Sequence, residues 1–109
     1  KMLHYIIVKW KKGSPEGLAD RVRELYRGAT TLSGIRSVEI RENITPRDNR
    51  YDLMVILHME EGALPTWDSS DLHQKWKADF GAYIEKKCIF DCNQAIENPR
   101  GGAAPIAGK

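Results

Sequence analysis

The chain has 109 residues, a length that fits one domain with a single modest hydrophobic core. Hydrophobic residues make up 41% of the sequence and charged residues 29%, proportions that are ordinary for a globular domain. The net charge of +2 argues against a protein that binds nucleic acid through a broad basic face. The apolar runs, such as residues 54–57, are far shorter than the roughly 18 residues expected of a membrane-spanning helix.

The N-terminal residues and the cysteines predict a cytoplasmic protein. The first residues lack the basic stretch, apolar run and small-residue cleavage site of a secretion signal. On one strand, Cys88 and Cys92 would lie about 13 Å apart, which is beyond the reach of a disulfide. We therefore expect two reduced, buried cysteines, with a disulfide between two chains as the alternative.

The first half of the chain predicts a strand, a helix and a second strand. Residues 2–11 are rich in β-branched and aromatic types, and their apolar side chains alternate onto both faces of a strand. Ser14 and Pro15 suit the start of a helix, whose apolar residues recur at helical spacing until Gly34 ends it. Residues 35–44 alternate between polar and apolar types, which predicts a half-exposed strand near an edge of the sheet.

The second half predicts a strand, two helical segments and a closing strand. Residues 50–60 form a strongly apolar strand, and residues 61–69 contain a glycine and a proline that favour a short, broken helix. Ser70 is expected to cap a longer helix. Residues 88–93 are expected to form the final strand, and residues 94–109 an extended C-terminal tail without a core of its own.

The predicted order βαββαβ matches the ferredoxin-like arrangement of an α+β domain, a four-stranded antiparallel sheet with both helices on one face. Because two helices cover only one face, the other face is left with apolar side chains. These are Leu3, Tyr5, Ile7, Met54 and Ile56. An exposed apolar patch of this kind indicates an interface, so we expect a homodimer in which two sheets pack face to face.

The residues resemble the stress-responsive α/β-barrel (Dabb) domain family, which belongs to the dimeric α+β barrel superfamily. Residues 4–11 resemble its His-x-Val-x-Phe-Lys opening, and residues 34–39 its Gly-Ile-x-x-Leu/Val-Glu strand. Residues 51–53 match its Tyr-Asp-Leu strand, while residues 72–73 and 89–91 match its second helix and closing strand. The resemblance spans residues 2–93 and implies a dimeric barrel of two ferredoxin-like domains.

Some plant members of that family are polyketide cyclases, whose pocket lies between sheet and helices and uses histidines and tyrosines. The resemblance places His4, Tyr26 and His73 on pocket positions of this kind. Leu53 stands where those cyclases carry another histidine, and Trp67 where they carry a tyrosine.

The residues themselves suggest how such a pocket would work. His4 shares a strand face with buried positions and His73 shares a helix stripe with Trp76, so both imidazoles are expected to face inward as a general base. Tyr26 would then donate a hydrogen bond to a developing enolate oxygen. Alternatively, the two histidines only connect the strand to the helix, and the aromatic residues only fill the hydrophobic core. Leu53, Trp67 and Trp76 are the predicted ligand contacts.

Two classes of function therefore remain open. The first is a barrel that binds a small apolar or aromatic ligand without known chemistry. The second is a cyclase-like lyase that performs intramolecular aldol chemistry, or a cofactor-free monooxygenase as found in the same superfamily. We expect no cofactor and no metal, because His4 and His73 supply only two ligands and Asp71 at a helix start more readily serves the helix dipole.

Overall fold

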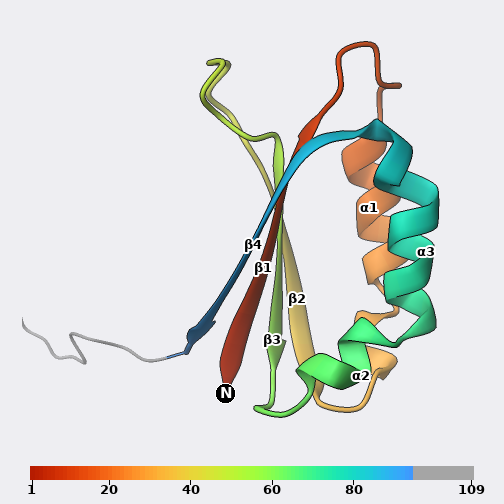
Figure 1. The fold of residues 1–109 in the computed structure, drawn as a ribbon, viewed down its shortest axis with the longest axis vertical. Coiled ribbons are helices and arrows are strands. Elements are labelled where there is room, and N and C mark those ends of the chain that lie inside the picture. The colour runs from red at the N-terminus through yellow and green to blue at the C-terminus, as the bar shows by residue number, and fades with distance from the viewer. Residues whose placement is uncertain (95–109) are drawn as a thin grey trace, which may run out of the picture.

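The computed structural model describes residues 1–94. The four strands are β1 (Met2–Trp10), β2 (Ile35–Glu42), β3 (Leu53–Met59) and β4 (Ile84–Asn93). The helices are α1 (Leu18–Tyr26), α2 (Leu64–Asp68) and α3 (Asp71–Phe80), with 3₁₀ turns η1 (Ala29–Thr31) and η2 (Gly81–Tyr83). The strands form one antiparallel sheet in the order β2-β3-β1-β4, and all three α-helices lie on one side of it (Figure 1). The predicted ferredoxin-like fold is confirmed.

The hydrophobic core lies between the sheet and the helices. Alternate residues of the central strands, such as Ile6 and Val8 on β1 and Val55 and Leu57 on β3, are fully buried on this side. The helical layer contributes large buried side chains, namely Val22, Tyr26, Trp67, Trp76 and Phe80. The core therefore uses one face of each central strand and leaves the other free.

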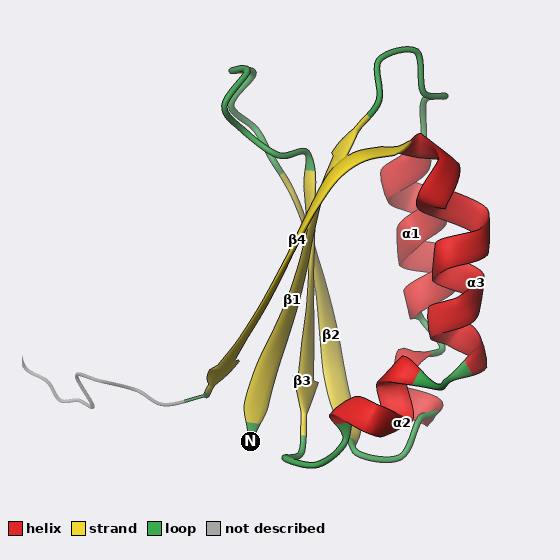
Figure 2. Cartoon of the chain, viewed as in Figure 1, coloured by secondary structure: helices red, strands yellow, loops and turns green. Residues whose placement is uncertain are grey.

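No helix of residues 1–94 covers the second face of the sheet, which we call the open face (Figure 2). Its apolar side chains are Leu3, Tyr5 and Ile7 on β1, Met54 and Ile56 on β3, and Cys88, Phe90 and Cys92 on β4. Phe90 is 58% exposed, and its ring centroid lies 6.2 Å from that of Tyr5. The residues of β1 and β3 on the open face were predicted from the sequence, whereas those of β4 were not.

Three local predictions were wrong. Helix α1 begins at Leu18 after Gly17, which adopts a φ of 82°, whereas the Ser14 hydroxyl donates to the Lys11 carbonyl in the preceding turn. The helix also ends at Tyr26, so the apolar residues beyond it belong to η1 and the following loop. Strand β4 begins at Ile84 rather than at residue 88, because an edge strand pairs on only one side and tolerates charged residues such as those at positions 85–87.

The cysteines also differ from expectation. Cys88 is exposed and Cys92 is partly exposed in the single chain, because both lie on the open face. Both are free, and the register of β1 and β4 places Cys88 opposite Ile7 and Cys92 opposite Leu3. Their burial would require a partner on that face.

Several predictions of local structure are confirmed. Ser70 caps α3, since its Oγ accepts a hydrogen bond from the His73 amide at 3.1 Å. Helix α2 is short and β2 lies at an edge of the sheet.

In residues 1–94, no helix is long and apolar enough to cross a membrane. The expected tail lies almost entirely outside the described residues.

Candidate functional site

A cavity of about 260 Å³ lies between the β1–β4 edge of the sheet and the helices. The strands contribute His4 and Ile6 from β1 and Lys87 and Ile89 from β4. The helical layer contributes Trp67, Asp68, His73, Trp76 and Lys77. The cavity thus combines apolar side chains from both layers with two imidazoles and three charged side chains, so it offers both apolar contact and hydrogen-bonding groups.

His4 is held by an acidic side chain from the neighbouring strand. The register of β1 and β4 places it opposite Asp91, and its Nδ1 lies 2.5 Å from Asp91 Oδ1. The His4 side chain is 7% exposed, whereas that of Asp91 is 41% exposed. When Nδ1–H donates to the carboxylate, Nε2 of the neutral ring is left with its lone pair free, as in a histidine oriented for general base catalysis.

His73 is positioned by the first turn of α3 and the residues before it. Its Nδ1 donates to the carbonyl oxygen of Asp68 at 3.0 Å, and its ring centroid lies 4.9 Å from that of Trp67. These contacts hold the ring on the cavity side of the helix, and neither of them is a hydrogen bond to Nε2. The two histidines therefore border one cavity from opposite layers.

Trp67 and Trp76 are almost completely buried, and they rest on Tyr26. The Tyr26 ring centroid lies 5.7 Å from Trp67 and 5.4 Å from Trp76. The Tyr26 hydroxyl is buried without a hydrogen-bond partner among residues 1–94, and this burial raises its pKa well above the ordinary value. Tyr26 thus supports the aromatic wall of the cavity from behind.

Two of the predicted site residues do not line this cavity. Tyr26 is fully buried against the tryptophans and does not belong to the lining of this cavity. Leu53 pairs with Val8, four residues along β1 from His4, and lies in the core at the other end of the sheet. The structure therefore brings together His4, His73, Trp67 and Trp76, but not Tyr26 and Leu53.

Three residues at or beside the cavity were not predicted from the sequence, namely Asp91, Lys77 and Lys87. Asp91 had a detectable signal, because an acidic residue inside an apolar closing strand shares the strand face of Ile89. Lys77 follows His73 by four residues and so lies on the same side of α3. Lys87 could not have been found, because the predicted strand began after it.

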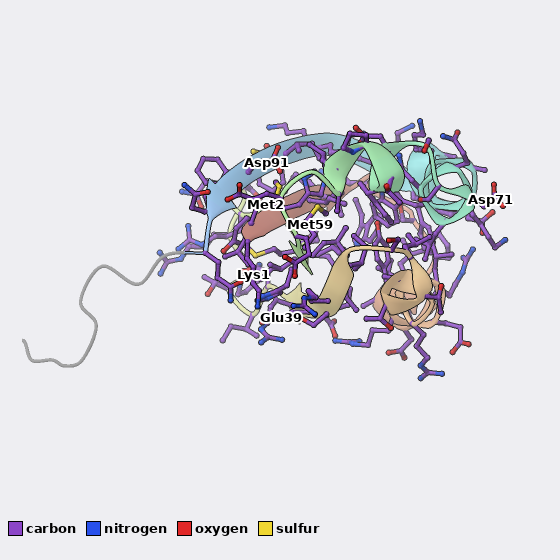
Figure 3. The ribbon with its side chains drawn as sticks, turned by 90° about the horizontal axis from the view of Figure 1, so that it is seen from below. Lys1, Met2, Glu39, Met59, Asp71 and Asp91 are labelled. Atoms are coloured by element: carbon purple, nitrogen blue, oxygen red, sulfur yellow. The ribbon has the colours of Figure 1, made fainter. Side chains whose placement is uncertain are left out.

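The described residues show no obvious metal centre. Among residues 1–94, no three histidine, cysteine or acidic side chains gather closely enough to hold a metal ion. Asp91 lies at the β4 edge of the sheet, while Asp71 is exposed at the outer side of the helical layer (Figure 3). Asp71 therefore does not join His4 and Asp91.

The sequence matches no protein-family model and no curated protein. Its fold, however, matches that of solved structures at low identity. A dimeric ferredoxin-like protein of unknown function from Thermobifida fusca has a TM-score of 0.74 at 10% identity, over 84% of this chain and 89% of that one. A Dabb family protein from Mesorhizobium loti has a TM-score of 0.65 at 14% identity, over 86% and 96% of the two chains.

A hydroxynitrile lyase from Passiflora edulis also shares the fold, with a TM-score of 0.70 at 11% identity over 87% of this chain and 95% of that one. Identities this low establish a common fold rather than a common activity. The chain is therefore a ferredoxin-like α+β domain with a small cavity beneath one edge of its sheet. The fold implied by the resemblance to Dabb proteins is confirmed.

Proposed function

We propose that this domain is a cytoplasmic homodimer that binds a small aromatic or apolar ligand in the cavity beside His4. The observation that carries the proposal is the convergence of His4, His73, Trp67 and Trp76 on one cavity of about 260 Å³. Ile89 provides exposed apolar surface beside the edges of the two indoles, and each imidazole provides a polar contact that would orient a ligand.

The open face supports the proposed dimer. Apolar side chains from three strands lie on this face without a covering layer, and patches of this kind mark interaction surfaces. A second copy supplies a matching surface through a two-fold axis. The dimeric state of fold neighbours such as the Thermobifida fusca protein supports this arrangement. It would also cover the two cysteines.

Three polar side chains of the open face form a connected network at its β2 side. His58 Nε2 lies 2.5 Å from Glu39 Oε2, and Arg41 donates to the other oxygen of Glu39 at 2.6 Å. Paired charges of this kind are less costly to cover than isolated ones. The network is therefore compatible with a face that packs against a second copy.

Ligand binding can be tested with phenol and indole as neutral aromatic probes. We expect these compounds to shift the NMR signals of the His4 ring and of the Trp67 and Trp76 indole groups at millimolar concentration. The variant His4→Ala should weaken phenol binding several-fold, because it removes the hydrogen-bond partner of the hydroxyl. Unchanged signals at all three residues would refute the proposed cavity.

A second candidate function is a lyase, and the His4–Asp91 pair favours it. A carboxylate beside Nδ1 orients the imidazole and stabilises the imidazolium formed when Nε2 takes a proton. In a hydroxynitrile, Nε2 of His4 would take the hydroxyl proton, the oxygen would form the carbonyl double bond as the carbon–cyanide bond breaks, and the imidazolium would give its proton to the departing cyanide. The shared fold with a hydroxynitrile lyase supplies the probe reaction.

Release of benzaldehyde from mandelonitrile tests this second candidate. Cleavage above the uncatalysed rate that disappears in His4→Ala and falls in Asp91→Asn would establish lyase chemistry. Absence of cleavage would leave ligand binding as the function. A cofactor-free monooxygenase would use the same base, and consumption of dioxygen would distinguish it from a lyase.

A further inference from the structure

Two lysines border the cavity at the end away from His4. Lys77 follows His73 by one helical turn on α3. Lys87 lies opposite Val8 in the β1–β4 register, four residues before Asp91 on β4. Lys87 therefore lies about 13 Å along β4 from Asp91, the partner of His4, so the lysines and the His4–Asp91 pair lie toward opposite ends of the cavity.

The lysine charges are not neutralised by the described protein. Within residues 1–94, ion pairs engage Lys75 with Asp79 but neither Lys77 nor Lys87. Of the acidic side chains near the cavity, Asp91 is paired with His4, whereas Asp68 lies at the His73 end, where its carbonyl binds that ring. Positive charge thus predominates at one end of the cavity and the acid–base pair at the other.

We propose that the natural ligand of the cavity is an aromatic carboxylate, whose acid group is bound by Lys77 and Lys87 while its ring packs on the apolar lining between them and His4. This inference rests on the proposed ligand-binding function and names the chemical class of its ligand. An ammonium group binds a carboxylate by charge-assisted hydrogen bonds, which are stronger than those between neutral groups. The apolar lining between the two polar ends comes from Ile89 and Ile6 on the strands and from the edges of the two buried tryptophans.

The experiment compares two probes of nearly equal shape, 4-hydroxyphenylacetate and its neutral amide, 4-hydroxyphenylacetamide. Their dissociation constants are measured by NMR titration at pH 7.5 and low salt, for the wild type and for the double variant Lys77→Gln/Lys87→Gln. Lys86→Gln serves as the matched control, because Lys86 adjoins Lys87 but lies on the other face of the strand.

We expect the carboxylate to bind at least tenfold more tightly than the amide in the wild type and in Lys86→Gln. The double variant should bind both probes with constants within threefold of each other, and higher salt should reduce the wild-type preference. Equal binding of the two probes to the wild type, or a preference that survives in the double variant, would overturn the inference but leave ligand binding intact. Failure of both probes to bind would overturn this inference and the proposed function together.

Discussion

His4 on β1 and Asp91 on β4 are direct cross-strand neighbours, and their side chains meet through a contact of 2.5 Å between Nδ1 and Oδ1. The pairing register fixes this contact, since the two residues share the helix-facing side of adjacent strands. Because His4 is buried and Asp91 is partly exposed, the carboxylate lies between the histidine and solvent at the sheet edge. The free ring nitrogen of His4 is then available to the cavity.

The first prediction concerns the tautomer of His4. The carboxylate of Asp91 favours the neutral ring that carries its proton on Nδ1. In Asp91→Asn this preference should be lost, because an amide can either donate or accept a hydrogen bond. The measurement is the ¹⁵N chemical shift of both ring nitrogens at pH 8. His58, which contacts Glu39, should be unaffected and is the internal control. An identical His4 tautomer in both proteins would contradict the proposed role of Asp91.

The second prediction concerns the dimer. Ile56 lies opposite Tyr5 on the central strands of the open face, so Ile56→Asp would bury a charge between two sheets. We expect this variant to shift the protein toward a folded monomer, with a dissociation constant raised at least a hundredfold in analytical ultracentrifugation. The control is Ala78→Asp, which introduces the same charge on the exposed side of α3. Equal self-association of Ile56→Asp and wild type would show that the open face is not the interface.

The third prediction concerns Gly34, which joins η1 to β2. Its φ is 84°, and a Cβ at this position would lie 2.7 Å from the Cβ of Ala63. Gly34→Ala therefore combines backbone strain with a steric clash and should lower the free energy of unfolding by about 2–4 kcal/mol. Gly13→Ala has a similar φ of 82° but no atom within 4 Å, so it should cost only about 1 kcal/mol. Urea denaturation measures both. Equal losses of unfolding free energy in the two variants would mean that the contact with Ala63 does not destabilise Gly34→Ala.

The fourth prediction concerns Tyr26 and alkaline pH. The pKa of Tyr26 is raised above its ordinary value of 10.0 by burial, so the folded chain keeps a proton that the unfolded chain releases. Stability should therefore be unaffected below pH 10.0 and should fall above it, by about 1.4 kcal/mol per pH unit from this group.

The variant Tyr26→Phe tests this dependence. It removes an unpaired buried hydroxyl, so at pH 8 its stability should equal or exceed that of the wild type by up to about 1 kcal/mol. Above pH 10.0 it should lose less stability than the wild type in denaturant titrations. Tyr83→Phe, at a half-buried position, is the control that retains Tyr26. A steeper alkaline loss in Tyr26→Phe than in the wild type would contradict the assignment.

Local patterns in the sequence were sufficient to predict the fold. The alternation of apolar residues identified β1 and β3, and the surplus of apolar side chains on their second faces predicted the open face. The cap at Ser70 was also predictable, because a cap depends on a few consecutive residues. These features depend on local periodicity and chemistry, which a single sequence displays.

The cavity was only partly predictable, because it depends on how distant elements pack. His4 and His73 could be placed by strand and helix periodicity, whereas Asp91 became a partner of His4 only through the β1–β4 register. Tyr26 shares the inward side of α1, yet Trp67 and Trp76 lie between it and the cavity. Periodicity indicates which residues face inward, but not which of them end at a cavity wall.

The most direct test of this account is a crystal structure of the protein grown with 4-hydroxyphenylacetamide. The account predicts two copies packed through their open faces, with the compound in each copy between β4 and α3, its ring against Trp76 and one end at His4. Copies that contact only through their helices, or a compound bound between the two sheets instead of beside His4, would contradict it.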